Sequence, residues 1–262
     1  MNIYKSDGRS TRNKGFWRFK IYIFIILGCG LVVLGIYIIF LSPLMKVQVE
    51  VVGNQRINSE ELLAAIQNQL LNKTIPKLLG INNYLSWIGK VKLDEPLLAK
   101  LTVDKMLWQK KVRLIIEERQ PFGVWCHDSA NLQHACYWFD KTGALFENAP
   151  APEGHLILRI DSDAAATPVI GQPTVNQEWY QVILRIIGFF EKNNLAVKKY
   201  EFKEPLQEFH ALSLAGASVN FSLRFDPANS LAGLATFLEK NSLKGLQYID
   251  LTVENRMYVK SR

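Results

Sequence analysis

The chain has 262 residues, a formal net charge of +7 and 48% hydrophobic residues. This apolar content excludes a disordered chain, while a basic balance is typical of proteins that bind nucleic acids or membranes. Residues 1–20 contain six basic side chains and one acidic side chain, so they carry +5 of the charge. The rest of the chain has no nucleic-acid-binding motif and no stripe of Lys and Arg, so we expect no nucleic-acid partner.

The longest apolar stretch runs from Ile21 to Met45 and contains 25 consecutive uncharged residues. As a helix it would be about 37 Å long, which exceeds the thickness of about 30 Å of the bilayer hydrocarbon. We therefore predict a single transmembrane helix over residues 21–44, in contact with the lipid bilayer. The stretch is longer than the apolar region of a signal peptide and has no A-x-A-like cleavage site after it, which predicts an uncleaved anchor.

The charges on both sides of this segment predict its orientation. Basic flanks stay in the cytoplasm, so residues 1–20 are expected to form a cytoplasmic tail. The bulk of the chain is then extracytoplasmic, anchored to the cell (inner or plasma) membrane. This outer part is long enough for one large domain or two small ones.

The first outer segment, residues 45–121, predicts the order β-α-α-β-β. Alternating valines favour a strand over 47–51, and a helix follows from Asn58, which is a good N-cap with Glu61 completing a capping box. Residues 81–88 have apolar side chains at helical spacing and predict a second helix, separated from the first by Pro76 and Gly80. Two further strands are predicted over 101–104 and 112–117, with the helices covering one face of the sheet.

The second outer segment, residues 122–262, is rich in predicted strands. Helices are predicted over 177–193 and over 228–241, the latter opened by Asp226 and Pro227. The last element is predicted as a hairpin, Gln247–Val253 and Arg256–Lys260, around a two-residue turn at Glu254 and Asn255. The other predicted strands cover 122–126, 136–139, 144–146, 156–160, 197–202, 208–214 and 218–225. The predicted fold class is α+β, with a single transmembrane helix, a β-α-α-β-β domain, and a mostly antiparallel β domain with two helices.

Several of these segments resemble the FtsQ/DivIB family of bacterial cell-division proteins. Val47–Gly53, Asn58–Leu62 and the later Glu118-Arg119-Gln120-Pro121 are similar to the POTRA domain of that family, although Gln109 follows Trp108 where the family often has Pro. Asp140–Phe146 is similar to the family's D-x-x-G-x-x-F stretch. The final residues resemble its closing signature Y-I-D-L-R-x-x-N-R-x-Y-V-K, with Thr252 at the position of the first Arg.

The resemblance implies a POTRA domain over 45–121 and an FtsQ-like β domain over 122–262. It also implies a non-enzymatic scaffold of the divisome, which binds single-pass division proteins such as FtsB and FtsL and links septal assembly to cell-wall synthesis. No cofactor and no small-molecule substrate are expected. The physical route would be addition of a partner strand to the last hairpin, and the edge of the POTRA sheet is a second possible surface. The candidate partner-binding residues are Tyr248, Asp250, Leu251, Asn255, Arg256, Tyr258 and Val259. Of these, Tyr248, Asp250, Leu251 and Arg256 could instead only pack and cap the last sheet.

Motifs for catalysis are absent from the sequence, which has no H-E-x-x-H, G-x-S-x-G or P-loop. One cluster, Cys126-His127 with His134 and Cys136, has ligands that suit zinc. Because neighbours in a strand face opposite ways, all four cannot converge without distortion. A disulfide between Cys126 and Cys136, free buried thiols, and a metal site all remain open, and the last would make the protein a metal-dependent envelope enzyme or sensor.

Overall fold

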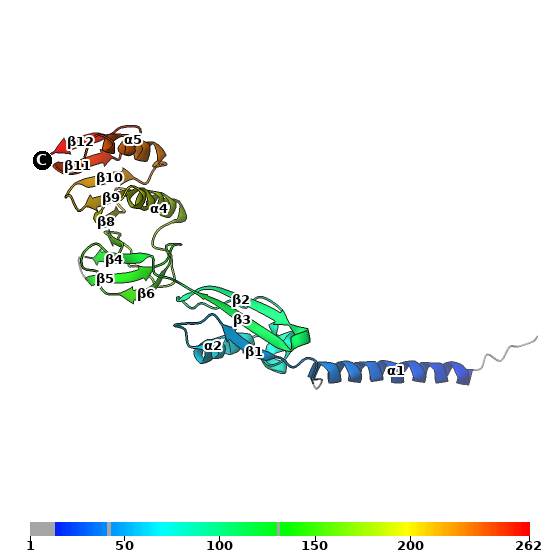
Figure 1. Ribbon diagram of the computed structural model, residues 1–262. Helices are drawn as coiled ribbons and strands as arrows, with labels where there is room; N and C mark the ends of the chain where they lie inside the picture. The colour runs from blue at the N-terminus through cyan, green and yellow to red at the C-terminus, as the bar shows by residue number, and fades with distance from the viewer. Residues whose placement is uncertain (1–13, 41–42, 130–131) are drawn as a thin grey trace, which may run out of the picture. The chain divides into compact units, whose positions relative to one another are not determined.

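The computed structural model describes residues 14–40, 43–129 and 132–262. The chain divides into two compact units. The first unit comprises Met1–Val52, Asn58–Lys92 and Thr102–Ile115, and the second comprises Gly53–Ile57, Leu93–Leu101 and Ile116–Arg262. The fold is mixed α+β, with one long apolar helix near the N-terminus and one large sheet (Figure 1).

Helix α1 spans Lys14–Phe40 and is 27 residues long. It contains a 20-residue stretch, Phe19–Ile38, that is long and apolar enough to cross a membrane and of which nothing is buried within the structure. The prediction of such a helix is therefore confirmed, but its bounds differ. The helix begins seven residues before the predicted segment, and Pro43 and Leu44 lie in a turn, because a proline disfavours helical geometry in the residue before it. Residues 41 and 42 are outside the described residues.

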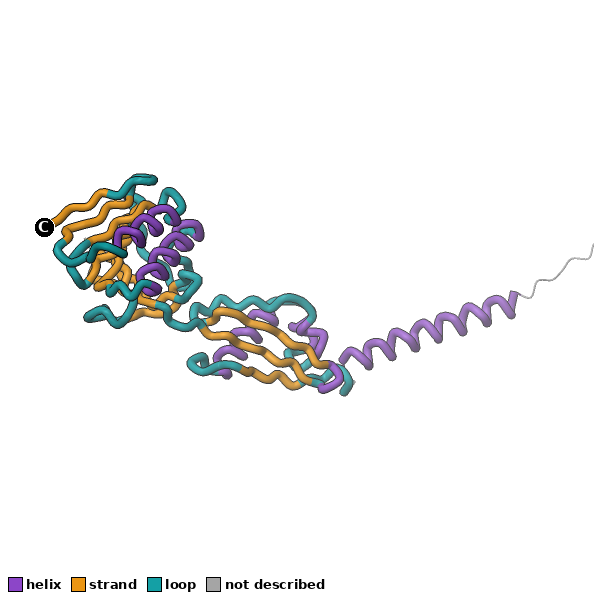
Figure 2. Tube along the Cα trace, turned by 45° about the horizontal axis from the view of Figure 1, so that its top comes forward, coloured by secondary structure: helices purple, strands orange, loops and turns teal. Residues whose placement is uncertain are grey.

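A three-stranded sheet follows α1 and has the order β1-β3-β2. Strand β1 (Gln48–Val52) runs parallel to β3 (Lys111–Glu118), and β2 (Leu98–Met106) precedes β3 in the chain. Helix α2 (Ser59–Leu71) lies behind the strands in Figure 2, and the short helix α3 (Thr74–Leu79) follows it in the chain. One row of β3 and one face of α2 are buried: Val112, Leu114, Ile116, Leu62, Ile66 and Leu70.

The turn after β1 and the start of α2 follow from local chemistry. Gly53 has φ +94°, and a Cβ at this position would collide with the carbonyl oxygen of Ile116, so the turn requires glycine. The Asn58 side chain accepts a hydrogen bond from the Glu60 N–H at 2.9 Å, which is the predicted N-cap. These two residues direct the chain from the strand into the helix.

The predicted order β-α-α-β-β is present, but its second helix is α3 and does not lie at residues 81–88 as predicted. Residues 81–88 contain only a short 3₁₀ helix, η1 (Tyr84–Trp87), and Pro76 does not break a helix but lies in the first turn of α3, where a missing N–H is tolerated. The helical spacing of the apolar residues does not match their burial. Trp87 is buried, with 1% exposure, whereas Ile88 is 66% exposed. The Trp87 indole N–H donates to the Ile81 carbonyl at 2.7 Å, which closes the short segment.

A nine-stranded sheet has the order β12-β11-β10-β9-β8-β7-β4-β5-β6. Five neighbouring pairs are antiparallel, and the pairs β10–β11, β4–β7 and β7–β8 are parallel. Helices α4 (Gln177–Lys192) and α5 (Ala228–Leu238) connect the parallel pairs β7–β8 and β10–β11. The strands are β4 (Gly123–Ser129), β5 (Leu132–Phe139), β6 (Leu145–Ala149), β7 (Arg159–Ser162), β8 (Val197–Lys203), β9 (Glu208–Ser213), β10 (Ser218–Ser222), β11 (Leu246–Leu251) and β12 (Tyr258–Ser261).

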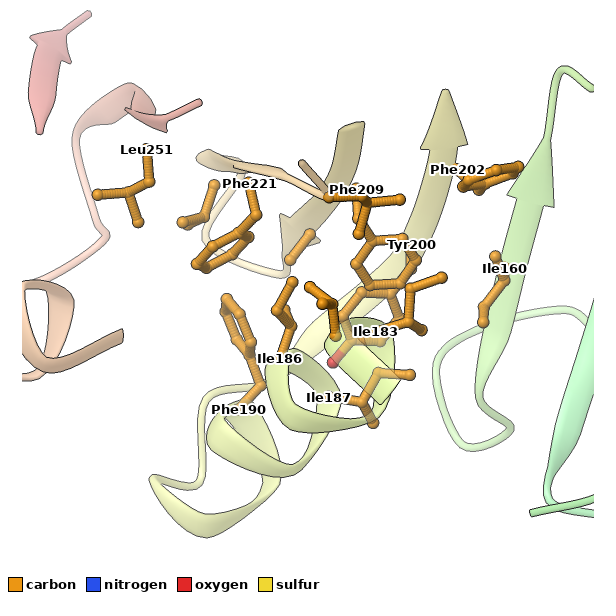
Figure 3. Packing of buried hydrophobic residues seen from close by; sticks show 14 of the residues in the cluster. Ile160, Ile183, Ile186, Ile187, Phe190, Tyr200, Phe202, Phe209, Phe221 and Leu251 are labelled. Carbon is orange, nitrogen blue, oxygen red and sulfur yellow. The ribbon is translucent and has the colours of Figure 1, made fainter. Parts of the chain in front are cut away.

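The main core lies between this sheet and α4 (Figure 3). Ile183, Ile186 and Phe190 of the helix face Tyr200, Phe209 and Phe221 of three neighbouring strands, and all six are nearly or fully buried. Their rings make edge and stacked contacts, with Tyr200 and Phe209 stacked at 5.2 Å between centroids. In β9 buried residues alternate with half-buried ones, so its face away from α4 is partly open to solvent. Strand β4 is instead buried on both faces, because Val124 and Cys126 form a second small cluster with Cys136.

The final hairpin differs from its predicted form. Strand β11 ends at Leu251 and β12 begins at Tyr258, so six residues connect them and not two. The Asp250 carboxylate ends β11 early because it accepts hydrogen bonds from the N–H and hydroxyl of Thr252 at 2.9 and 2.7 Å. Asn255 does adopt the expected positive φ, at 58°.

Candidate functional site

Strand β12 forms one edge of the nine-stranded sheet. Its four residues, Tyr258–Ser261, are all exposed, with Tyr258 at 47% and Val259 at 42%. Within the described residues the sheet places only β11 beside it. An edge strand of this kind presents unpaired backbone N–H and C=O groups along its outer side.

The register with β11 sets which way the edge side chains point. Tyr258 is opposite Asp250, and Val259 is opposite Ile249, which is fully buried on the core face. Because side chains alternate along a strand, Val259 lies on the helix-covered side of the sheet and Tyr258 on the open side. A partner strand at this edge would therefore meet an apolar side chain on one face and an aromatic one on the other.

Backbone alternation also indicates which groups point outward. The Arg262 N–H donates to the Gly245 carbonyl at 3.0 Å, toward β11. In an antiparallel pair the residues that face the neighbour alternate, so Lys260 and Tyr258 point their backbone groups at β11. We infer that Val259 and Ser261 point theirs away from the sheet.

The other predicted partner-binding residues divide into two sets. Leu251 is 2% exposed and packs in the main core, and Asp250 is committed to capping Thr252, so both are structural in this arrangement. Arg256 is exposed and donates to the Tyr258 hydroxyl at 3.3 Å, and Lys260 lies 5.9 Å from the ring centroid of half-buried Tyr248.

Asn255 is also exposed, and its side-chain oxygen accepts a hydrogen bond at 3.1 Å from Asn229 on α5. This contact holds the connection between the two last strands against the helix. The accessible part of the predicted site is thus Tyr258 and Val259. Exposed Arg256 and Asn255 and half-buried Tyr248 belong to it as well. Leu251 cannot belong to it.

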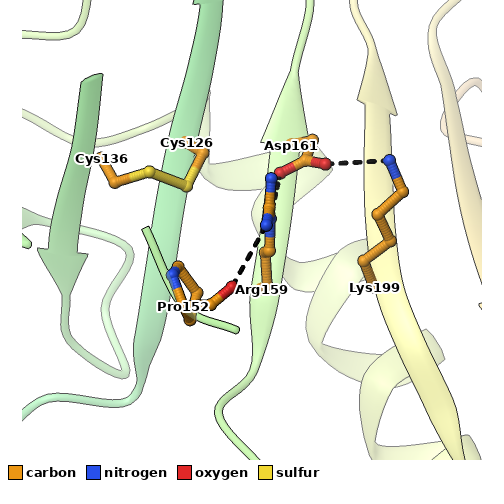
Figure 4. Close-up of a disulfide and its surroundings, with 6 residues drawn as sticks. All are labelled: Cys126, Cys136, Pro152, Arg159, Asp161 and Lys199. Carbon is orange, nitrogen blue, oxygen red and sulfur yellow. Dashed lines mark hydrogen bonds and ion pairs between the residues drawn. A yellow bond between two sulfur atoms is a disulfide. The ribbon is translucent and has the colours of Figure 1, made fainter. Parts of the chain in front are cut away.

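The cysteine cluster predicted from sequence is a disulfide. Cys126 of β4 and Cys136 of β5 are directly opposite each other, with 4.0 Å between their Cα atoms, and are joined (Figure 4). His127 is 4% exposed on the neighbouring position of β4, and the side chain of His134 is outside the described residues. The disulfide removes both thiolates from any metal site.

Sequence reasoning missed a network of buried polar groups in the second unit. The Glu118 carboxylate accepts hydrogen bonds from the N–H groups of Gln55, Arg56 and Ile57 at 2.7–3.0 Å. The next residue, Arg119, forms a salt bridge with Asp140. The signal was present in the sequence, since these residues are part of the E-R-x-P and D-x-x-G motifs, but motif spacing does not show that two motifs meet.

Asp140 is the centre of this network. It is 6% exposed, and besides Arg119 its carboxylate accepts from the Thr142 N–H and hydroxyl and from the Ala144 N–H, at 2.6–3.1 Å. The Tyr180 hydroxyl donates to its backbone carbonyl at 3.0 Å. Gly143 completes the turn, because a Cβ there would come within 2.8 Å of the Tyr180 ring.

The pKa values of both acids respond to these contacts. Burial would raise the pKa of Glu118, but the three backbone N–H donors and the Arg56 charge outweigh it, so the pKa is lowered. Burial likewise opposes ionisation of Asp140, and hydrogen bonds from Thr142, Arg119 and Ala144 lower its pKa overall. Both side chains are therefore charged at neutral pH and serve to fix the fold.

The chain matches no protein-family model and no curated protein. Among the described residues, no group of three or more His, Cys, Asp or Glu side chains is placed to hold a metal ion. The arrangement of the β12 edge allows one kind of interaction above all, which is pairing with an extended backbone strand supported by side-chain contacts on both faces.

Proposed function

We propose that this protein is a single-pass membrane scaffold of the bacterial divisome. Helix α1 anchors it in the cell membrane with the N-terminus in the cytoplasm, and the rest of the chain is extracytoplasmic. In this role the three-stranded sheet with its helices is a POTRA domain, and the second unit carries the docking edge. The protein performs no catalysis and holds other single-pass division proteins of the FtsB/FtsL type, linking septal assembly to cell-wall synthesis.

The observation that carries this proposal is the open edge at β12. Natural sheets cover or blunt their edge strands, because unpaired backbone groups invite association with other chains. Here the edge is exposed along its whole length and carries an aromatic and a β-branched side chain. Such an edge suits addition of a strand from a partner.

The charges near the edge favour a particular partner. Arg256, Lys260 and Arg262 are exposed at or next to β12, so a partner segment with Asp or Glu beside its apolar residues fits best. The same lysine and arginines disfavour pairing of two identical β12 edges, because like charges would face each other. The edge is thus suited to a different chain more than to a second copy of this one.

The alternative, a metal-dependent enzyme or sensor, has no support that would make it a second proposal. It required thiolate ligands from Cys126 and Cys136, which the disulfide occupies. The surface edges of the three-stranded sheet, β1 and β2, remain a second possible docking surface within the scaffold proposal.

The sharpest test replaces Val259 by proline. Proline lacks the N–H that we infer to point outward, and an edge strand tolerates it because the bonds to β11 are made by the neighbouring residues. Val259→Pro in the full-length protein should abolish co-purification of FtsB/FtsL-type partners from membranes of dividing cells. The matched variant Val259→Ala keeps the N–H and should retain most of the binding.

Two controls make the result decisive. Near-ultraviolet circular dichroism of Val259→Pro should match the wild type, which shows that the second unit remains folded. Equal recovery of the partners with folded Val259→Pro and wild type would exclude strand addition at β12. Recovery of no division protein by the wild type itself would count against the scaffold.

A further inference from the structure

One end of the first unit gathers three segments that are distant in sequence. They are residues 43–48 after α1, residues 73–92 containing α3 and η1, and residues 105–111 at the β2–β3 turn. The Val47 N–H donates to Asn82 and the Tyr84 N–H to Met45, both at 2.8 Å, while the Gln48 N–H donates to Lys110 at 2.8 Å. The chain that leaves α1 is therefore bonded on one side to the α3–η1 segment and on the other to the β2–β3 turn.

Large apolar side chains are exposed at this end. Trp108, at the tip of the β2–β3 turn, is 98% exposed, and Ile75 and Leu78 of α3 are 58% and 69% exposed. Leu44 and Ile88, from the other two segments, are similarly open. Among the other described residues of the first unit, leaving α1 aside, the only exposed large apolar side chain is Val52, with 39% exposure. The exposed apolar side chains are thus concentrated at one end.

The charges of the same segments are all of one sign. None of the three segments contains Asp or Glu. The acids next to them in sequence are Glu50 on β1, which pairs with Lys111, Asp94, and Asp104 on β2. Lysines are frequent in all three: Lys46, Lys73, Lys77, Lys90, Lys92, Lys105, Lys110 and Lys111. Aromatic and aliphatic side chains mixed with lysines, without acids, are typical of surfaces that lie in the interface of an anionic bilayer.

The length of the chain fixes how far this end can be from the membrane. Leu44 lies four positions after Phe40, the last residue of α1. Fully extended, the chain spans about 14 Å over four positions. The headgroup region on each side of a bilayer is about 5–8 Å thick, so this end of the unit cannot move far beyond the headgroups.

We propose that this end of the first unit, with Trp108 at its tip, lies in the outer headgroup region of the membrane that α1 crosses. The occupant of the apolar surface is the lipid, with Trp108, Ile75 and Leu78 at the level where aromatic and aliphatic groups meet the acyl chains, and the lysines beside anionic headgroups. The contact restricts how the outer unit turns about its anchor. This inference rests on α1 being transmembrane, as the proposed function requires.

The test uses the full-length protein in vesicles of phosphatidylcholine and phosphatidylglycerol. Phosphatidylcholine with brominated acyl chains quenches tryptophan emission only at short range. We expect the wild type to lose more emission in brominated vesicles than Trp108→Phe, and the difference to grow with the phosphatidylglycerol content. Equal losses in the two proteins would overturn the proposal.

A position control separates contact at this end from general contact with the vesicle. Glu60 is exposed in the first turn of α2. The chain reaches this turn after β1 has ended at Val52, so Glu60 lies at the opposite end of the first unit from the β2–β3 turn. In the double variant Trp108→Phe with Glu60→Trp, the new indole should not be quenched. Quenching of this indole to the same extent as Trp108 would also overturn the proposal, since no one end would then be preferred.

Vesicle flotation distinguishes a lack of lipid contact at Trp108 from a failure of α1 to hold the protein in the membrane. If the wild type floats with the vesicles and Trp108 is not quenched, α1 holds the protein but this surface does not contact lipid. If the protein does not float at all, the membrane anchor fails, and the proposed scaffold fails with it.

Discussion

The two edges of the nine-stranded sheet differ in how far other parts of the chain cover them. At the β6 edge, the Leu145 N–H donates to the Gln172 carbonyl at 3.0 Å, and the Leu145 carbonyl accepts from the Gly171 N–H at 2.7 Å. The loop that follows β7 therefore covers this edge of the sheet. Leu145 and Phe146 are buried, and Glu147 forms a salt bridge with Arg56. At the β12 edge, in contrast, every residue is exposed.

The same contrast holds for the connections that support each edge. The turn before β6 is fixed by Asp140 with its hydrogen bonds and salt bridge, and the strands next to it are joined by the disulfide. The connection before β12 has six residues and is held mainly by the Asp250 cap and one Asn–Asn contact. The β6 edge is thus closed by the protein's own contacts, while the β12 edge is open, as the proposed strand addition requires.

The largest effect is expected from Asp140→Ala. This change leaves Arg119 without its partner and removes the hydrogen bonds to Thr142 and Ala144, and breaking a buried ion pair by removing one member costs about 3–5 kcal/mol. We expect the free energy of unfolding of the second unit to fall by about 4 kcal/mol, measured by urea denaturation of the full-length protein in detergent. Lys141→Ala, an exposed neighbour in the same turn, should change it by less than about 0.5 kcal/mol.

The disulfide beside the closed edge is expected to contribute less. Cys126 and Cys136 are separated by 10 residues, and closing a loop of this size stabilises a fold by about 3 kcal/mol. Replacing both by alanine, or reducing the wild type, should lower the free energy of unfolding by similar amounts. Cys29→Ser should have no such effect, because Cys29 is a free cysteine on α1. A reductant that leaves the wild type unchanged would show that the disulfide does not stabilise this edge.

Much of this architecture followed from local sequence patterns. The N-cap at Asn58, the valine alternation of β1, the helix from Gln177 and the long apolar helix all depend on neighbouring residues, and the structure contains them. The residues on the accessible edge were also named, since Tyr258 and Val259 fall in the last predicted strand. Patterns of this kind are set by periods of 2 or 3.6 residues, which a sequence displays directly.

What the sequence did not reveal depends on contacts between distant residues. Leu251 is part of the closing signature and could either meet a partner or pack the last sheet, and strand alternation places it in the core. The early end of β11 depends on the Asp250 cap, and the pairing of Arg119 with Asp140 brings together residues 21 positions apart. Tyr180 was not expected to be buried, yet its hydroxyl anchors the Asp140 turn.

Acid should weaken the contacts that hold the closed edge. The pKa values of Glu118 and Asp140 are lowered in the folded protein, so both stabilise it fully above their ordinary pKa values of about 4. This stabilisation is lost as the pH falls from about 4 through the lower folded values. The melting temperature should therefore decline below about pH 4, and less steeply in Asp140→Asn. An identical acid dependence in that variant would show that Asp140 does not carry the effect.

The smallest effect on stability is expected at the open edge itself. Tyr258→Ala removes a half-exposed ring whose contact is with Arg256, so the free energy of unfolding should change by less than about 0.5 kcal/mol. Leu251→Ala, only seven positions earlier but in the core, should cost about 2–5 kcal/mol. Co-purification of the division partners should nevertheless be weaker with Tyr258→Ala, because an exposed aromatic side chain that a docked strand would cover contributes much of the binding energy. A Tyr258→Ala protein that binds its partners normally but unfolds as easily as Leu251→Ala would reverse the assignment, making the aromatic residue a structural support and leaving the backbone alone to hold the partner.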